Sequence, residues 1–302
     1  MSFKNISNFI VLNISFPFLI LGFPIAAYFT SIEMSVAPEI IVAIFLTMGF
    51  FIIYFLECHF PYLKEWNHNH HDKKSDIFHF FSNSLILVIF QNIGLLLLTK
   101  IEYTGFITKQ MPAGFKIHWF IQFLLFYLFI ELIHYVTHKY SHTNRFLWKL
   151  HEIHHSAKRL HALNTFRIHF LDTIIRIAIP ALLLLLLDIS ENAILVYTIH
   201  SSLVGFLHHS NIKINYRGWN HIFSTADLHR FHHSKKINIS NTNYGKALII
   251  YDLIFGTYYN SKFHDVTDVG VEGTDLPDSF IAHSKYPFSK NSSSEYDKYS
   301  ST

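Results

Sequence analysis

The chain has 302 residues and a mass of 35.4 kDa; half of its residues are hydrophobic and only 15% are charged. Soluble globular domains carry about 25% charged residues, so this composition, with a mean hydropathy of +0.25, excludes an ordinary soluble protein and indicates a membrane protein. The net charge of +3 suits contact with anionic lipid but is too small to favour nucleic acid as a partner, and the single cysteine, Cys58, excludes an internal disulfide and a thiolate metal cluster.

Six apolar segments follow one another along the chain, at residues 9–29, 40–56, 77–98, 117–135, 173–187 and 192–207. A bilayer-spanning helix needs roughly 20 mostly apolar residues, a length that the first four segments approach or exceed. The fifth is short and contains Arg176 and Pro180, so we expect it to form, with the sixth, a hairpin that does not fully cross. No cleavable signal peptide is expected, because the first segment is long and lacks a small-residue cleavage pattern. The sequence therefore predicts an all-α membrane bundle of four to six membrane segments.

Lysine and arginine residues concentrate on one side of this bundle. If the N-terminus is cytosolic, residues 58–76 and the chain after residue 135 are cytosolic too, provided that the hairpin returns to that side. Loop 31–39 on the other side has neither residue, whereas the next outer loop runs against the pattern with Lys100, Lys109 and Lys116. The bias predicts this orientation because cytosolic loops carry an excess of Lys and Arg.

The polar regions 138–172 and 208–302 hold most of the histidines and are expected to form one helical cap on the cytosolic side. The chain is thus expected to divide into N-terminal membrane helices and loops (1–116), a catalytic region (117–265) and a polar tail (266–302). The frequent use of Ile, Asn, Lys and Phe favours a bacterial inner membrane; a eukaryotic protein of this kind would lie in the endoplasmic reticulum.

Eight histidines fall into three clusters with helical spacing, His138-x-x-x-His142, His151-x-x-His154-His155 and His229-x-x-His232-His233. Residues three and four apart share one face of a helix, so two imidazoles of a cluster can converge on one metal ion or on two neighbouring ones, and the doubled histidine adds a third ring on nearly the same face. Neutral imidazole binds iron, copper, nickel and zinc well, and magnesium and calcium poorly. One tetrahedral zinc takes at most four ligands, so eight histidines indicate two metal ions.

The residues around these clusters form a longer pattern that contains Glu131, Leu147-Trp148, Ser156, Asn164, Arg167, His169, His209-Ser210-Asn211, Asn243-Tyr244-Gly245 and Asp252 to Thr257. From Ile117 to Tyr259 the sequence resembles the superfamily of fatty acid hydroxylases and sterol desaturases, which are integral-membrane di-iron oxygenases. Glu131 stands where that superfamily usually has Asp, Lys139 replaces an Arg, and Tyr251 replaces a Trp.

The resemblance implies that the histidines hold the metal and that no other side chain is itself catalytic. The implied ligands are His138, His142, His151, His154, His155, His209, His229, His232 and His233. Residues expected beside these ligands, or as additional ligands, are Glu131, His134, His169, His208 and Asp172. His68, His70 and His71 are expected in a solvated loop.

The same resemblance implies a function: two iron ions and O2 would hydroxylate, or desaturate, an unactivated C–H bond of a fatty acyl, sterol or related lipid. Zinc could replace iron in isolated protein. The chain has neither a Gly-x-Gly-x-x-Gly nor a haem-attachment motif, so electrons would come from a ferredoxin, a cytochrome b5-like protein or a reductase. Lys235 and Lys236 could help to dock that donor.

Two alternatives without oxygenase activity remain, a divalent-metal transporter and a metal-binding membrane protein. Transporters place their ligands near the middle of the bilayer, whereas these clusters lie outside the apolar segments or at their ends, which disfavours transport. Among enzymes, a desaturase, an alkylglycerol ether monooxygenase and a carotenoid hydroxylase are not separated by the sequence.

Overall fold

The computed structural model describes residues 13–103, 118–186, 189–261, 266–274 and 276–289, together with Phe9 and Val11. Over this part the chain is helical, and its only extended pairings are three isolated β-bridges. The longer helices are α3 (Phe23–Glu33), α4 (Pro38–His59), α5 (Lys73–Tyr103), α6 (Trp119–Thr143), α7 (Arg145–His155), α8 (Phe170–Leu186) and α9 (Glu191–His209). The short elements are α2 (Ser15–Pro17), η1 (Phe18–Gly22), η2 (Lys64–Asn67), η3 (Ala162–Phe166), η4 (Arg217–His221), α10 (Ala226–His232), α11 (Ile237–Ser240), α12 (Ile250–Phe255), α13 (Phe280–Lys285) and η5 (Tyr286–Phe288). The predicted all-α class is confirmed.

Four helical stretches of the described chain are long and apolar enough to cross a membrane, namely Ser15–Glu33, Pro38–His59, Lys73–Gly94 and Trp119–Thr143. They correspond to the first four predicted segments, so the chain is an integral membrane protein with four candidate spans. Large apolar side chains point outward from them: Phe51 on α4 is 63% exposed and Phe81 on α5 is 62% exposed. Such side chains are stable there only when lipid covers them.

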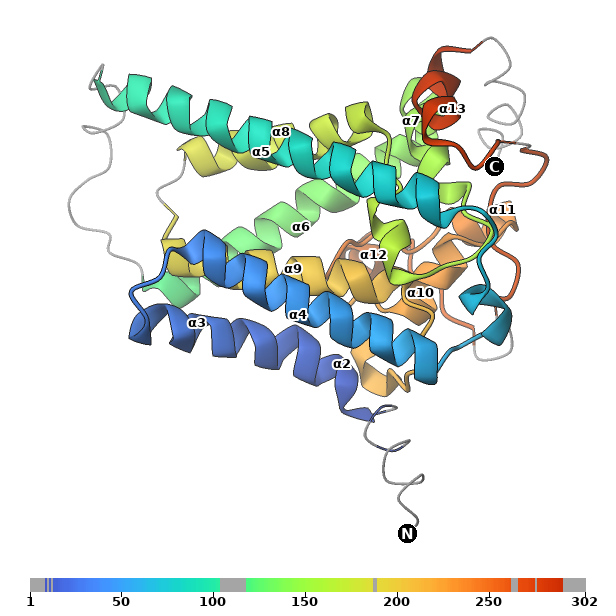
Figure 1. Cartoon of the computed structure of the whole chain (residues 1–302), viewed down its shortest axis with the longest axis horizontal. Coiled ribbons are helices and arrows are strands. Elements are labelled where there is room, and N and C mark those ends of the chain that lie inside the picture. The colour runs from blue at the N-terminus through green and yellow to red at the C-terminus, as the bar shows by residue number, and fades with distance from the viewer. Residues whose placement is uncertain are drawn as a thin grey trace.

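The long helices run side by side, and most of the short helices gather at one end of the bundle (Figure 1). Helix α9 packs against α3, α4 and α6. A Cβ atom at Gly49 would lie 2.3 Å from Cδ2 of Leu203, so the glycine on α4 permits the close approach of α9. Because α9 is held in this way, its last residues, His208 and His209, reach the end where the short helices lie.

Two buried arginines attach the segment after α7 to α5 and the chain just before it. Arg159 donates two hydrogen bonds of 2.7 Å to the carboxylate of Asp72. Arg167 donates from Nε to Oδ1 of Asp76 at 2.6 Å, and Asn164 donates to the other oxygen of Asp76 at 2.8 Å. A buried charge is tolerated when it is paired and hydrogen-bonded, as these groups are. The start of α5 therefore fixes the course of the chain between α7 and α8.

The described C-terminal residues pack against this network. Arg167 donates from Nη1 to Asp278 at 2.8 Å, and Nδ1 of His283 lies 3.0 Å from Nε2 of His79 on α5. Helix α13 thus lies on α5, inside the region expected as a polar tail (266–302). The serine-rich end of that region, and the outer-loop residues Lys109 and Lys116, lie outside the described residues.

Candidate metal centre

The end of α6 and the start of α7 form a sharp corner that brings the first two histidine clusters face to face. Helix α6 continues past the predicted apolar segment to Thr143, so His138 and His142 lie on its last turns. Asn144 then caps α7: its side-chain oxygen accepts hydrogen bonds of 3.1 Å from the backbone N–H groups of Phe146 and Leu147. The chain reverses at this cap, and α7 carries its histidines back towards those of α6.

Five buried histidines form the first group, which consists of His138, His142, His151, His155 and His232. One ring nitrogen of each lies within 4.8 Å of those of the others. Nε2 of His138 is 3.0 Å from Nε2 of His151 and 3.0 Å from Nε2 of His232. The consecutive helices α6 and α7 and the distant helix α10, whose His232 is 94 residues from His138, therefore supply one cluster of ring nitrogens.

Four buried histidines form the second group, which consists of His154, His209, His229 and His233. Nε2 of His209 lies 3.2 Å from Nε2 of His154, 3.2 Å from that of His233 and 3.1 Å from that of His229. The group draws on α7, the end of α9 and α10.

Backbone carbonyls determine which nitrogen of several rings carries the proton. Nδ1 of His138 lies 2.7 Å from the carbonyl oxygen of Tyr244, and Nδ1 of His232 lies 2.8 Å from that of Thr242. A carbonyl only accepts, so Nδ1 is the donor and the neutral ring keeps a lone pair on Nε2. These Nε2 lone pairs point at one another, which is repulsive unless a cation lies among them. Ligands that share a metal at about 2.0–2.1 Å are themselves roughly 3 Å apart, which the observed separations match.

Burial keeps these imidazoles neutral, the form that binds metal. It lowers the pKa of His154 to about 3 and that of His232 to about 4, although a hydrogen bond to a backbone carbonyl opposes the shift in each ring. In addition, Nε2 of His142 and Nε2 of His155 are buried and have no hydrogen-bond partner. An unpaired buried nitrogen costs stability, and a bound metal ion would satisfy both.

The two groups adjoin, because each doubled histidine is divided between them. His155 belongs to the first group and His154 to the second, with ring centroids 5.7 Å apart. His232 and His233 are divided in the same way, at 5.5 Å. We expected all three rings of a cluster such as His151-x-x-His154-His155 to lie on nearly one face. Instead, the two histidines that are four residues apart belong to one group, and the histidine between them belongs to the other.

The five residues expected beside the ligands have different surroundings. Oδ2 of Asp172 accepts a hydrogen bond from Nδ1 of His151 at 3.0 Å, so Asp172 is in direct contact with the first group. Glu131 accepts instead from the backbone N–H groups of Ala247 and Leu248, at 2.6 and 2.9 Å.

The three expected histidines lie outside both groups. The ring of His208 stacks on that of His229, with centroids 4.6 Å apart. His134 lies buried on α6, one turn before His138. Nε2 of His169 lies 3.2 Å from the carbonyl oxygen of Ser284, and His169 belongs to neither group. His68, His70 and His71 are exposed, as expected for a solvated loop.

Two residues near the first group were not singled out as site residues by the sequence. Arg176 donates from Nε to Oδ1 of Asp172 at 2.9 Å, and its Nη2 lies 3.0 Å from Nδ1 of His151. Its spacing of four residues from Asp172 was a usable signal, because such residues meet on a helix. Oδ1 of Asn241 lies 3.3 Å from Nδ1 of His142, and no pattern in the sequence indicated this contact.

A third group of potential ligands, Asp72, Asp76 and His161, has a different character. Both carboxylates are already paired with Arg159 and Arg167. Burial alone would lower the pKa of His161, but the Asp72 and Asp76 carboxylates, whose oxygens lie 3.9 and 3.3 Å from its Nε2, outweigh burial and raise that pKa. The imidazole between two carboxylates that are already paired with arginines is part of an ion-pair network, which explains this group without a metal ion.

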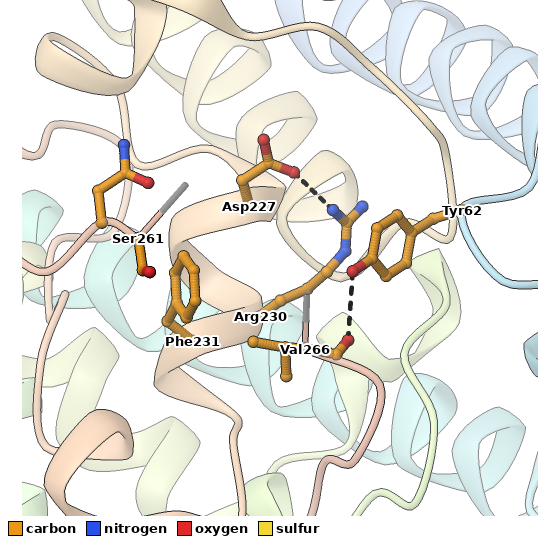
Figure 2. A pocket seen from close by; sticks show the side chains of 7 residues that line it. Tyr62, Asp227, Arg230, Phe231, Ser261 and Val266 are labelled. Carbon is orange, nitrogen blue, oxygen red and sulfur yellow. Dashed lines mark hydrogen bonds and ion pairs between the residues drawn. The ribbon is translucent and has the colours of Figure 1, made fainter. Parts of the chain in front are cut away.

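Helix α10 is anchored on the side that carries Arg230 (Figure 2). Arg230 lies over the ring of Tyr62 at 4.0 Å and donates to Asp227 at 2.6 Å and to the carbonyl of Ile212 at 3.0 Å. The adjoining pocket has a volume of about 90 Å³. Pockets for drug-sized ligands measure roughly 300–1,000 Å³, so this one is too small for a lipid chain, and its polar contacts serve to hold α10 in place.

Comparisons with known proteins agree with this geometry. Residues 123–257 match the model of the fatty acid hydroxylase family. Over 193 residues, 64% of the chain, the sequence is 34% identical to the ornithine lipid hydroxylase OlsE of Rhizobium tropici, and it spans 56% of that protein. Over 155 residues, 49% of the chain, it is 29% identical to an alkylglycerol monooxygenase of Caenorhabditis elegans, and it spans 28% of that protein. No solved structure matches. All nine clustered histidines lie within the segment 123–257, which matches the fatty acid hydroxylase family.

Proposed function

We propose that this chain is a membrane-bound hydroxylase that inserts oxygen from O2 into a C–H bond of a lipid, using two iron ions and electrons from a separate protein. The carrying observation is the convergence of nine neutral, buried imidazoles in two adjoining groups. The names of both relatives, a hydroxylase and a monooxygenase, favour hydroxylation over desaturation and a lipid as substrate.

The donor set fits iron. Imidazole nitrogen binds iron and zinc alike, so zinc in the isolated protein would not by itself contradict an iron enzyme. When bound, a pair of irons supplies the O2-dependent chemistry that no side chain can perform, the oxidation of an unactivated C–H bond.

The chain's own residues prepare the site. The carbonyls of Tyr244 and Thr242 and the carboxylate of Asp172 hold protons on Nδ1 of three ligands, which orients their Nε2 lone pairs inward. Each of the nine rings is at most 7% exposed, so bulk water is kept away from the reacting atoms. Both groups also lie at the ends of α6 and α9 rather than in the middle of a span, which disfavours the transporter alternative.

We further propose that the histidine groups face the cytosol, on the ground of the Lys and Arg bias, and that the electron donor docks nearby. Lys235 is paired with Asp268 at 2.5 Å, which leaves the exposed Lys236 as the better candidate for contact with an acidic donor. Replacement of Lys236 by Glu should slow reduction of the metal by the donor and leave the metal content unchanged; an unchanged rate would remove this docking site.

The decisive experiment uses iron-loaded protein in nanodiscs made from a total lipid extract of the source cells, a chemical reductant and O2 labelled with oxygen-18. The expected product is a lipid that carries one labelled oxygen atom, detected by mass spectrometry. His154→Ala and His232→Ala, one from each group, should abolish the product, whereas His68→Ala, at an exposed position, should not. Iron-loaded, reduced protein that labels no lipid, or full turnover by both Ala variants, would contradict the proposal.

A further inference from the structure

The described residues beyond the segment that matches the family model form a strap over the end of the bundle. The match ends at residue 257, and the strap consists of residues 266–274 and 276–289. It is closely packed: Val269 is 1% exposed and His283 is fully buried. Its last turns reach two long helices, because α13 packs on α5 and η5 packs on α7 (Figure 1). The family match leaves the role of this strap open.

The first contact of the strap is with the end of helix α10. The N–H of Gly270 donates to the carbonyl oxygen of His233 at 3.0 Å, and Ser234 and Val269 form a β-bridge beside it. Carbonyls at the C-terminal end of a helix have no partner within the helix, so the strap supplies one. Gly270 has a φ of +120°, and a Cβ atom there would lie 3.5 Å from the carbonyl oxygen of Ala157, just after α7 ends. The strap thus ties the end of α10 to the end of α7.

The second contact reaches His154 through Arg167. Oδ1 of Asp278 in the strap accepts a hydrogen bond of 2.8 Å from Nη1 of Arg167. The carbonyl oxygen of the same arginine lies 3.2 Å from Nδ1 of His154, which donates to it. Arg167 is fully buried and is also held by Asp76, but that carboxylate is shared with Asn164. Among the described residues, the carboxylate of Asp278 pairs with Arg167 alone.

These contacts matter because the second group lacks some of the partners that orient the first. In the first group, Nδ1 of His138 and of His232 lies next to a backbone carbonyl. In the second group, Nδ1 of His229 and of His233 is buried and has no hydrogen-bond partner. A ring without such a partner is oriented only by packing and by the position of its own backbone. The strap acts on the backbone of His233 and on the acceptor of His154, so it supports two of the four rings.

We propose that the strap clamps the second histidine group, and that Asp278 is a positioning residue for the metal ion held there. The inference rests on the proposed function, which requires two metal ions, and it specifies how one of them is retained: the second ion is bound tightly only while the strap is docked. Asp278 does not touch the metal. It fixes Arg167, whose carbonyl holds the proton of His154 on Nδ1 and so directs its Nε2 lone pair towards the other rings of the group.

The test measures the affinity of each group for metal separately. Two variants each keep one group: His138→Ala with His142→Ala keeps the second, and His229→Ala with His209→Ala keeps the first. Asp278→Asn is added to both, and binding of ferrous iron is titrated in competition with a chelator and without O2. When only the second group is present, Asp278→Asn should weaken binding about tenfold, the lower end of the effect of removing a direct partner of a metal ligand. When only the first group is present, the affinity should not change.

Asp268→Asn is the matched control. Asp268 is another carboxylate of the strap, but its side chain is 72% exposed and pairs with Lys235, so both affinities should stay unchanged. A merely structural defect would weaken both groups alike, so equal weakening of the two groups by Asp278→Asn, or weakening of neither, would overturn the proposal.

The intact chain gives a second measurement, which decides the question if the Ala variants do not fold. With all nine histidines present, Asp278→Asn should lose one ion at a lower chelator concentration than the wild type and keep the other as the wild type does. Earlier loss of both ions together, or of neither, would overturn the proposal as well.

Failure of the proposed function would be seen separately. If the ions respond in this way but the wild type oxidises no lipid, the proposed reaction is wrong and the clamp stands. If lipid is oxidised and Asp278→Asn changes neither affinity, the clamp is wrong and the reaction stands.

Discussion

Asp172 is the carboxylate in direct contact with a clustered histidine, and Asp172→Asn tests what that contact does. The residue is 2% exposed. Its Oδ2 accepts from His151 and its Oδ1 accepts from Arg176, at 3.0 and 2.9 Å. An amide has one accepting oxygen and no charge, so the variant leaves either the ring or the guanidinium without an acceptor and leaves both without an anionic partner.

The expected loss can be worked from this geometry. A hydrogen bond to a charged group contributes about 1.5–3 kcal/mol, and removal of an outer partner of a metal ligand typically weakens metal binding about 10–100-fold, which is roughly 1.4–2.7 kcal/mol. Asp172→Asn should therefore weaken metal binding at the first group by this factor and affect the second group much less, because Asp172 is hydrogen-bonded to His151 and acts on His154 only through its charge.

The assay is removal of metal by a graded series of chelator concentrations, with the metal remaining per chain measured by mass spectrometry. Glu152→Gln is the matched control: Glu152 is also 2% exposed, adjoins His151 in the sequence and accepts from Thr274 at 2.8 Å. Equal chelator sensitivity of Asp172→Asn and wild type would refute the assigned role. Loss of both metals at the same chelator concentration would refute the independence of the two groups.

Three further predictions concern stability. The metal-free protein should lose stability as the pH falls from 6.5 towards 3. The unfolded chain protonates its histidines below pH 6.5, whereas burial lowers the pKa of His154 in the folded chain to about 3, so protons favour the unfolded state. Melting temperatures measured across this pH range report the loss of stability. Gly245→Ala should lower the unfolding free energy by about 1–3 kcal/mol and weaken metal binding, since its Cβ would lie 2.2 Å from the carbonyl oxygen of Leu248. Arg159→Met should cost about 3–5 kcal/mol in a denaturant titration, because it leaves the Asp72 carboxylate buried without its ion-pair partner.

Each of these predictions has a control or an outcome that contradicts it. A melting temperature that stays constant between pH 7 and 4 would show that the rings are not held neutral. Gly218→Ala, where a Cβ meets nothing within 4 Å, should leave stability and metal binding unchanged. Arg159→Lys should be less damaging than Arg159→Met, and an equal loss would mean that packing rather than charge is responsible.

The helical class and the convergence of the histidines could be predicted because both depend on local periodicity. Apolar runs of span length predict membrane helices, and spacings of three and four residues predict rings on one side of a helix. The expectation that all three rings of a doubled cluster lie on nearly one face was wrong, because adjacent residues point about 100° apart around a helix, enough for His154 and His155 to serve neighbouring groups.

Other parts of the site depend on tertiary structure that no local pattern encodes. The carbonyl of Tyr244 meets His138 across 106 residues, and Asn241 meets His142 across 99. The pairing of Asp76 with Arg167 spans 91 residues. In each case a side chain is matched to a group brought close by the packing of α5, α6 and α10, so its role appears only when the helices are in place.

The central claim is that the nine histidines hold two metal ions, one in each group. The most direct test is the number of metal ions per chain in protein purified from iron-supplemented cells, for the wild type and for variants that remove two rings of one group, His138 with His142 or His229 with His209. The account predicts two ions in the wild type and one in each variant. A single ion in the wild type, or complete loss of metal in both folded variants, would contradict it.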